Sequence, residues 1–481
     1  MKKVVSIFSK CFWLVSGLLL FCNACSVSKK INKQVIQVLL QDSVLATGQI
    51  GISIYEPATK QYWYNYNADK YFVPASNVKL FTCYAAMQHI GDSLTGLWYQ
   101  PFNDTAINIM PFGDPTFMHP AFAKQPVINF LQQSKKTLLV SNQNNVAPLG
   151  KGWSWDDYNE TFMAERNTWP IYGNVVDITL QGFKNTNAYT AVPDFNISPS
   201  YFKDKIDSLF VLPTSLLKNS VLQADSVNSN ESQFNIIRQK DANHFTLKYN
   251  EEQTAFTNAQ IPFCVDNNAV TIDILNTNFA LAIKQGQLND GDLYHAMPPH
   301  VQWHTIKTEP THNVLQHMMY YSDNFIAEQV LVMLQQQSFW QLQPLNNTEE
   351  VIAYIIQNNL KDVPQPPIWV DGSGLSRYNL FTPQSFVYII NKMNNEFGID
   401  KVKSILTTSG QGTLKNYYVQ DSTFIYAKTG TLSGVVALSG FVITKKKKLL
   451  IFSILTNNFV GKARLVRRSI EKFITNLIQQ N

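Results

Sequence analysis

The sequence predicts an α+β fold in which an antiparallel sheet packs against helices and a large, mainly β insert interrupts the domain. Alternating apolar residues form two hairpins, one over residues 49–66 and one over residues 435–455. Apolar residues at helical spacing follow Ser76 and recur in the last part of the chain. Between residues 97 and 303, short strand-like runs, asparagine-rich loops and scattered prolines dominate, without a long amphipathic helix.

The composition is that of a globular protein and excludes one class of function. The 481 residues are enough for two or three domains, and the chain is 45% hydrophobic and 15% charged. Its net charge of +5 is small, whereas a dedicated nucleic-acid-binding protein carries a concentrated basic stripe. The run Lys445–Lys448 separates two apolar runs and is therefore predicted to be an exposed turn. No nucleic-acid partner is expected.

Residues 1–24 are predicted to be a signal peptide. Lysines precede an apolar run, Cys11–Cys22, which is shorter than the roughly 20 residues of a membrane-spanning helix. Cys25 follows the small residue Ala24 and resembles the cleavage site of bacterial lipoproteins, at which the cysteine is lipidated. We therefore expect a periplasmic lipoprotein held on a membrane through Cys25, with an ordinary signal peptide as the alternative.

The first elements of the mature chain are predicted to be a hairpin and a buried helix. Gln49–Tyr55 alternates as a strand, and the aromatic run Gln61–Tyr66 follows a short turn. The segment after Ser76 is apolar on most sides, which is typical of a buried helix. We expect the hairpin to pack over this helix, and Cys83 within the helix to be a buried free thiol.

Ser76 and Lys79 are a candidate nucleophile and base. Ser76 stands two residues after Pro74, where a helix can begin, and Lys79 follows one turn later on the same face. A serine hydroxyl becomes a good nucleophile when a neighbouring neutral lysine takes its proton. The spacing S-x-x-K is weak by itself, because it recurs at other places in the chain. These are Ser26–Lys29, Ser200–Lys203, Ser215–Lys218 and Ser469–Lys472.

The second half of the chain contains two further short motifs. Ser322-Asp323-Asn324 lies within a helix predicted over Val314–Val332, although a second S-x-N occurs elsewhere. Lys428-Thr429-Gly430 is the only K-T-G of the sequence, and it precedes the hairpin of residues 435–455. The other elements predicted here are the glycine-rich loop Asp371–Arg377, a helix over Pro383–Phe397 and a C-terminal amphipathic helix over Val466–Leu477 that packs on the sheet.

The motifs S-x-x-K, S-x-N and K-T-G in this order are the signature of penicillin-interacting serine acyl transferases. More closely, the chain resembles the class C low-molecular-mass penicillin-binding proteins, which are D-alanyl-D-alanine carboxypeptidases and endopeptidases with a large insert. The resemblance covers nearly the whole mature chain, apart from residues of about 180 to 290. It includes the contexts of all three motifs and also Gly113–Thr116, Gly152–Asp157 and Asp371–Arg377.

This resemblance implies a penicillin-binding, serine β-lactamase-like transpeptidase domain with helices on both faces of its antiparallel sheet. The peptidase domain would comprise residues 25–96 and 304–481, and the mainly β insert residues 97–303. The implied activity is cleavage of peptidoglycan peptides through an acyl-enzyme at Ser76, and β-lactam antibiotics would bind the same serine. No cofactor and no metal are expected, and a homodimer is left open.

The resemblance also assigns catalytic roles. Ser76 would attack the carbonyl of the penultimate D-alanine, and Lys79 would take its proton. Burial and the charge of Lys428 would lower the pKa of Lys79 so that it can act as a base. Ser322 would pass a proton to the leaving amine. Asn324 would position Lys79 and the substrate amide.

The substrate-binding residues implied by the resemblance are Lys428, Thr429, Gly430, Thr431 and Asp157. Lys428 and Thr429 would bind the terminal carboxylate of the substrate. The backbone N–H groups of Ser76 and Thr431 would form an oxyanion hole, in which one donor contributes roughly 2–4 kcal/mol. Asp157 would lie near the diamino acid of the substrate, where a carboxylate can pair with a free ammonium group.

Two other functions share part of this pattern. A β-lactamase-like hydrolase carries the same three motifs but usually lacks so large an insert, and it would release penicillin quickly. A catalytically silent peptidoglycan-binding scaffold would not be acylated at Ser76. The presence of every expected catalytic residue favours the peptidase.

Overall fold

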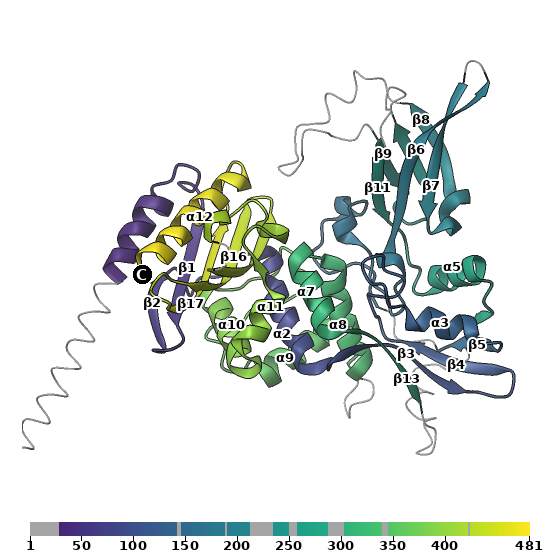
Figure 1. Cartoon of the computed structure of the whole chain (residues 1–481), viewed down its shortest axis with the longest axis horizontal. Coiled ribbons are helices and arrows are strands. Elements are labelled where there is room, and N and C mark those ends of the chain that lie inside the picture. Colours follow the sequence, from purple (N-terminus) through teal and green to yellow (C-terminus); the bar gives the residue numbers. More distant parts are fainter. Residues whose placement is uncertain are drawn as a thin grey trace, which may run out of the picture. The chain divides into compact units, whose positions relative to one another are not determined.

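The structure is a computed structural model in which the chain forms two compact units (Figure 1). It describes residues 28–141, 146–187, 190–211, 234–249, 257–286, 303–338, 345–421 and 424–481. The predicted signal peptide and Cys25 lie outside the described residues. Within the described residues, unit 1 comprises the chain up to Leu80, Asp362–Trp369 and Asn379–Asn481, and unit 2 comprises Phe81–Lys361 and Val370–Tyr378.

Unit 1 contains a six-stranded antiparallel sheet with the strand order β14-β15-β16-β17-β1-β2. Both predicted hairpins are present, as β1–β2 and β16–β17, and Lys445–Lys448 forms the exposed turn between β16 and β17. The strands are β1 (Gln49–Glu56), β2 (Gln61–Tyr66), β14 (Thr407–Thr408), β15 (Ile425–Leu432), β16 (Val435–Ile443) and β17 (Leu449–Asn457). β1 pairs with β17, so the first and last strands of the sequence are neighbours.

Helices cover both faces of this sheet, as predicted. α12 (Ala463–Gln480) packs on one face, and the core beneath it contains the even-numbered residues Ile52 and Ile54 of β1. Gly51 points to the other face, where α10 (Pro383–Phe397) begins against it. Because successive side chains of a strand point to opposite faces, α12 and α10 pack on opposite faces of the sheet. A short helix, α11 (Ile399–Ile405), follows α10.

Within unit 1, a helix that was not predicted to do so covers the first hairpin. The hairpin β1–β2 was expected over the helix that follows Ser76, and the structure shows β1 packed against α10. The turn that carries Ser76, Ala75–Val78, contacts β15 and β16. The alternating pattern of β1 predicts a strand but does not identify the helix that covers it, and in the structure β1 is buried along most of its length.

Unit 2 has the mainly β character predicted for the insert. Its largest sheet is mixed and has the order β12-β5-β4-β3-β13, and two smaller sheets have the orders β11-β6-β7 and β8-β10-β9. The strands are β3 (Ser93–Pro101), β4 (Ala106–Pro111), β5 (Thr137–Val140), β6 (Val175–Asn187), β7 (Thr190–Ser198), β8 (Ile206–Val211), β9 (Phe234–Arg238), β10 (Phe245–Tyr249), β11 (Thr257–Pro262), β12 (Ile283–Gln285) and β13 (His304–Pro310). β3 and β13 are partners and extend the sheet beyond residues 97 and 303 on both sides.

The helices of unit 2 correct one prediction. The single helix expected over Val314–Val332 is two helices, α7 (Thr311–Tyr321) and α8 (Asn324–Ser338). The chain turns at Ser322, which has the left-handed φ of 58°. The carboxylate of Asp323 then accepts the N–H of Ile326 at 2.9 Å and caps the start of α8. The other α-helices described in unit 2 are α3 (Pro126–Gln133), α5 (Ala269–Phe279), α9 (Thr348–Asn359) and the part of α2 (Lys79–His89) from Phe81 onward.

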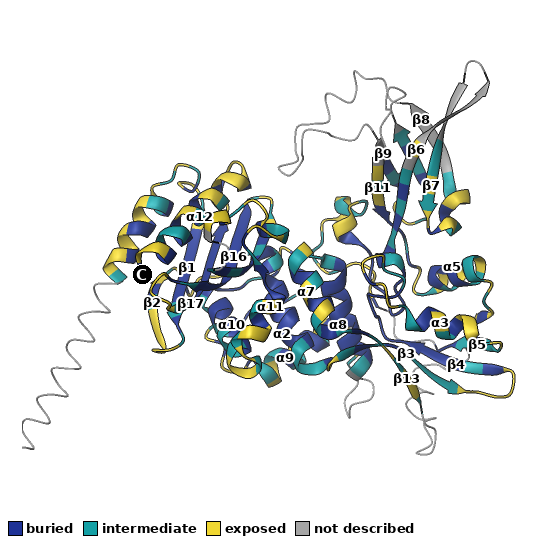
Figure 2. Cartoon of the chain, in the orientation of Figure 1, coloured by how far each residue is buried: buried dark blue, intermediate teal, exposed yellow. Residues whose placement is uncertain are grey.

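Burial follows the predicted apolar patterns (Figure 2). β16 and β17 are buried along most of their length, and α12 buries one face while exposing the other. The helix predicted after Ser76 is present as α2 (Lys79–His89), and Cys83 within it is a fully buried free thiol, as expected. Among the described helices, none has the length and apolar character to cross a membrane.

Candidate active site

The segment before Ser76 is fixed to the sheet of unit 1 by hydrogen bonds at its backbone. The side chain of Asn457, at the end of β17, accepts the N–H of Val73 at 2.7 Å and donates to its carbonyl oxygen at 3.0 Å. Ala75 then has the left-handed φ of 47°, which is uncommon for a residue with a side chain. The chain thereby turns sharply, and Ser76 is presented in a 3-10 turn that leads directly into α2.

Ser76 and Lys79 are in hydrogen-bond contact, as their spacing predicts. The side-chain nitrogen Nζ of Lys79 donates to Oγ of Ser76 at 3.0 Å. Lys79 is completely buried, and Ser76 is half-buried. The other described S-x-x-K pair in unit 1 differs, because Ser469 donates to the carboxylate of Asp42 and Lys472 is exposed. Burial of the lysine against the hydroxyl is what distinguishes the pair at Ser76.

A second buried lysine, Lys428, belongs to the same cluster in unit 1. It is fully buried on β15, and its Nζ donates to the carbonyl oxygen of Thr429 at 2.8 Å. Burial, and then the positive charge of Lys79, hold the pKa of Lys428 well below its usual range. Two positive charges in one desolvated site repel each other, and this repulsion favours the unprotonated form of Lys428.

Gly430 explains why the K-T-G motif ends in glycine. A Cβ atom at this position would lie 2.7 Å from the carbonyl oxygen of Pro74 and 3.1 Å from the backbone nitrogen of Ser76. Only glycine therefore lets β15 pass this close to the turn of the nucleophile. The first and third motifs, whose lysines Lys79 and Lys428 are 349 positions apart in the sequence, thus meet at the backbone within unit 1.

A buried chain of hydrogen bonds supports this contact from the sheet. The side chain of Asn77 donates to the hydroxyl of Ser439 at 2.8 Å, and that hydroxyl donates to Ser453 at 2.8 Å. All three residues are fully buried. The turn of the nucleophile is thus held by side chains of β16 and β17, which limits its movement.

The alternation along β15 places the two threonines on the other face. Lys428 and Gly430 lie opposite Ser439 and Ala437 of β16, on the face of Ser76, whereas Thr429 and Thr431 share the face of α12. There, the guanidinium of Arg467 donates to Oγ1 of Thr431 at 2.5 Å. Among the described residues, Arg467 has no carboxylate within the 4.0 Å of an ion pair. Arg467 could not be predicted as a site residue, because the C-terminal helix carries several charged residues at similar spacing.

Ser322 and Asn324 belong to unit 2, where they flank the break between α7 and α8. Both side chains are half-buried. The amide of Asn324 donates to the carbonyl oxygen of Phe162 at 3.0 Å. The residue between them, Asp323, forms an ion pair of 3.7 Å with His317. Asp323 therefore holds the turn between α7 and α8 through its contacts with Ile326 and His317, and Ser322 and Asn324 flank it.

Two further motif segments meet in unit 2 around Asp157. The indole of Trp153 donates to the carboxylate of Asp371 at 2.9 Å, which joins residues 152–157 to the glycine-rich loop. Asp157 is half-buried; burial and the charge of Asp156 raise its pKa, whereas the charge of Arg377 acts in the opposite direction. Arg377 is exposed and was not predicted as a site residue. The structure therefore places a carboxylate and a guanidinium together on this surface of unit 2.

Comparison with known proteins decides the family. The sequence profile of the D-Ala-D-Ala carboxypeptidase 3 (S13) family matches residues 32–480. The chain belongs to this family. Membership of the S13 family confirms the prediction of a serine-type D-Ala-D-Ala carboxypeptidase and disfavours both alternatives.

Two curated proteins are similar to this S13 chain over most of its length. Penicillin-sensitive carboxypeptidase A of Dictyostelium discoideum is 23% identical over 460 residues, which cover 84% of this chain and 82% of that protein. The D-alanyl-D-alanine carboxypeptidase of Actinomadura sp. (strain R39) is 23% identical over 463 residues, which cover 89% of this chain and 81% of that protein.

A solved structure confirms the predicted fold class. Penicillin binding protein 4 of Haemophilus influenzae superposes with a TM-score of 0.67 at 19% identity, covering 93% of this chain and 99% of that one. The same protein complexed with a novel β-lactam gives a TM-score of 0.65 at 18% identity. The S13 chain thus has the α+β fold of a penicillin-binding protein, with the insert included.

A buried ion pair in unit 2 of this S13 chain supports the surface around Trp153. Arg166 pairs with Glu328 at 3.1 Å, and both side chains are almost completely buried. The guanidinium also lies 5.5 Å from the ring centroid of Trp153, and the carboxylate accepts the N–H of Ser373 at 2.7 Å. Burial, followed by the charge of Asp371, raises the pKa of Glu328, and Arg166 opposes this shift. The pair connects α8 to both motif segments.

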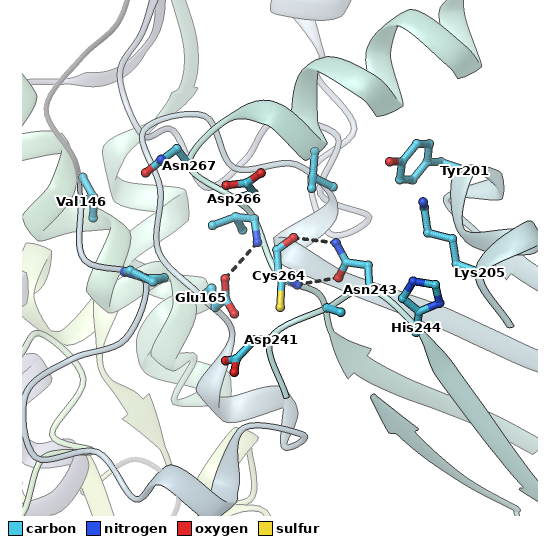
Figure 3. Close-up of a pocket in the computed structure, with 14 residues that line it drawn as sticks. Val146, Glu165, Tyr201, Lys205, Asp241, Asn243, His244, Cys264, Asp266 and Asn267 are labelled. Atoms are coloured by element: carbon cyan, nitrogen blue, oxygen red, sulfur yellow. Dashed lines mark hydrogen bonds between the residues drawn. The ribbon is translucent and has the colours of Figure 1, made fainter. Parts of the chain in front are cut away.

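Unit 2 also contains a polar cavity of about 540 Å³ (Figure 3). Glu165, Asp241 and Asp266 surround Cys264 on one side of it, and Lys205 lies on the other side. Burial, and then the charge of Glu165, raise the pKa of the Cys264 thiol to about 12. The thiol stays protonated at neutral pH, so Cys264 is not a second nucleophile.

Proposed function

We propose that the chain cleaves D-alanyl-D-alanine bonds of peptidoglycan peptides through an acyl-enzyme at Ser76, and that penicillin acylates the same hydroxyl. The observation that carries this proposal is the 3.0 Å contact between Nζ of Lys79 and Oγ of Ser76. A buried amine at this distance can accept the proton of the hydroxyl as the oxygen attacks. The names of the relatives support the same reaction class and sensitivity to penicillin.

In the proposed reaction, Oγ of Ser76 attacks the carbonyl carbon between the last two residues of the substrate. The hydroxyl proton passes to Nζ of Lys79, and the negative charge on the carbonyl oxygen is stabilised by the backbone N–H groups of Ser76 and Thr431. The C–N bond then breaks, and the leaving nitrogen takes a proton through Ser322. Water hydrolyses the resulting ester and restores the serine.

Recognition of the substrate is proposed for the strand β15 and for two residues of unit 2. Lys428 and Thr429 bind the terminal carboxylate at the edge of β15, where its two faces meet, and Arg467 holds Thr431 from the α12 face. β14 pairs only with Ala427 and Tyr426, so the edge of β15 from Lys428 onward has no strand partner among the described residues. An extended peptide can add to such an edge. Asn324 then positions the substrate amide.

Release of D-alanine tests this function. The soluble chain, incubated with a peptide ending in D-alanyl-D-alanine, should release one equivalent of D-alanine per cleaved peptide. Ser76→Ala should abolish the release while keeping the thermal midpoint of the wild type. D-alanine release by folded Ser76→Ala at the wild-type rate would exclude Ser76 as the nucleophile.

The lysine pair predicts a pH dependence of acylation. Only the unprotonated base accepts the proton of Ser76, so the rate should rise as pH rises through the pKa of the pair. This rise, the ascending limb of the pH–rate profile, should lie well below pH 10.5, the ordinary pKa of lysine. Burial and the repulsion between the two lysines favour loss of a proton. In Lys428→Met the repulsion is gone, and the limb should move to higher pH. Rates of penicillin acylation from about pH 5 to 10 measure it, and an unmoved limb would contradict the pairing.

Asp157 is proposed to pair with the ammonium group of the diamino acid in the substrate. Asp157→Ala should lower kcat/KM for muropeptides about tenfold to a hundredfold, the contribution of a charge-assisted hydrogen bond. Penicillin acylation needs no such contact and should stay nearly unchanged. Asp156→Ala is the matched control, because this neighbouring carboxylate is exposed and accepts from Ser154. Equal losses for both substrates would indicate a folding defect instead of a recognition role.

We further propose that the protein is periplasmic and anchored by a lipid on Cys25. A small residue precedes Cys25 at the end of an apolar run, as in bacterial lipoproteins. Labelled palmitate should therefore enter the wild type and not Cys25→Ala. Incorporation that persists in Cys25→Ala would place the lipid elsewhere, and no incorporation in the wild type would favour an ordinary signal peptide.

A further inference from the structure

Six lysines gather at one end of unit 1 from two segments that are more than 400 positions apart in the sequence. Three lie on the N-terminal helix, which is described from residue 28, and three lie in the turn between β16 and β17. The lysine patch consists of Lys29, Lys30, Lys33, Lys445, Lys446 and Lys447. Both segments meet the end of α12, as Figure 1 shows for the purple helix and the yellow α12.

Hydrogen bonds fix the two segments to this same helix end. Nζ of Lys30 donates to the carbonyl oxygen of Gln480 at 3.3 Å. The backbone N–H of Lys446 donates to the carbonyl oxygen of Asn481 at 3.0 Å, and that of Lys445 to Ile478 at 2.9 Å. The three acceptors are Ile478, Gln480 and Asn481, at the end of α12. The two lysine segments therefore lie next to each other.

The positive charge of the patch is not neutralised by neighbouring carboxylates. Lys29, Lys30 and Lys33 are exposed, as are all lysines of the turn. Residues 28–41, 443–449 and 472–481 contain no aspartate or glutamate. Among the described residues, the only ion pair of this turn joins Lys448, which is outside the patch, to Glu56 at 3.2 Å. Six lysines therefore lie here with no aspartate or glutamate paired to them among the described residues. Nζ of Lys445 lies 4.5 Å from the ring centroid of Phe424, and the terminal carboxylate of Asn481 leaves a large excess of positive charge.

The place of the patch along the chain indicates what it faces. Cys25 and the apolar run before it precede residue 28 by only three positions. Three residues span at most about 11 Å even when fully extended. Lys29 is four residues from Cys25, so a membrane that holds the chain at Cys25 lies within about 14 Å of it. This is less than two Debye lengths, each about 8 Å at physiological salt. At that distance, the charge of a lipid surface still acts on the patch.

We propose that the lysine patch docks unit 1 on an anionic phospholipid surface, as a contact additional to the N-terminal anchor. The ligand is the lipid headgroup rather than a soluble polyanion, because the proposed anchor at Cys25 holds the patch close to the membrane. Each lysine near an anionic surface strengthens the contact roughly fivefold, so six act strongly together. The docking fixes which end of unit 1 faces the membrane.

The test uses the full chain reconstituted into vesicles of phosphatidylcholine alone or with 30% phosphatidylglycerol, roughly the anionic content of a charged leaflet. A water-soluble acylating reagent modifies exposed lysines, and mass spectrometry gives the rate at each position. We expect Lys446 and Lys447 to react at least about threefold more slowly in the anionic vesicles, with full recovery at high salt. Lys415, an exposed lysine of the same unit, is the internal control and should not change.

Variants separate docking from anchoring. Lys445→Gln/Lys446→Gln/Lys447→Gln should lose the slower acylation of Lys33 in anionic vesicles, while flotation with neutral vesicles stays as in the wild type. Equal rates at Lys446 in both kinds of vesicle would overturn the proposal. Protection by soluble poly(glycerol phosphate) but not by vesicles would also overturn it, and would assign the patch to an anionic polymer. Penicillin acylation is unaffected in every case, so this outcome is independent of the proposed activity.

Discussion

Lys79→Arg should fold normally and yet be acylated by penicillin at least about a hundredfold more slowly than the wild type. Arginine keeps the positive charge but stays protonated at any working pH, so it cannot accept the proton of Ser76. The contact of 3.0 Å between Lys79 and Ser76 would then join a hydroxyl to a permanent cation. The expected loss is that of general base catalysis, which contributes roughly a hundred- to ten-thousand-fold.

Stopped-flow acylation measures this loss, with Lys428→Arg as the matched control. Both lysines are fully buried in the same cluster, so both substitutions place a guanidinium where an ammonium was. Because the proposed role of Lys428 is charge recognition, its variant should lose less. Near-wild-type acylation by folded Lys79→Arg would remove Lys79 from the role of base and leave Ser76 without an activator.

Arg166→Met should lower the stability of unit 2 by about 3–5 kcal/mol, because it leaves the buried carboxylate of Glu328 without its partner. The thermal midpoint should fall by roughly 10 °C. The loss should be smaller in Arg166→Met/Glu328→Gln, where neither member of the pair keeps its charge. Scanning calorimetry of the two variants measures the difference.

An exposed ion pair of the same chain provides the control for this stability effect. Arg468 pairs with Glu471 at 2.5 Å, but 45% of its side chain is exposed. Arg468→Met should therefore change stability by less than about 1 kcal/mol. Equal effects of Arg166→Met and Arg468→Met would show that burial of the first pair is not what makes it important.

Local patterns of apolar and polar residues predict much of the fold and of the site. The hairpins at both ends, the amphipathic α12 and the buried Cys83 follow from local alternation and helical spacing. The contact of Ser76 with Lys79 follows from one turn of helix. Such features depend on neighbours within a few positions, and their residues are therefore visible in the sequence.

Features that depend on distant residues could not be predicted in the same way. The break at Ser322 requires a left-handed residue, and the apolar pattern continues across it from α7 to α8. Arg467 resembles its charged neighbours on α12 until the fold brings it to Thr431. The cover of β1 by α10 depends on topology. In each case, the local sequence does not show which distant segment of the chain packs against these residues.

The central claim is that Ser76 is the residue that becomes covalently acylated. Mass spectrometry of the intact chain after brief exposure to penicillin tests it most directly, followed by digestion to locate the adduct. We predict one added penicillin per chain, located on the peptide that contains Ser76, and no adduct on Ser76→Ala. An adduct on another serine, or unchanged labelling of folded Ser76→Ala, would contradict the account.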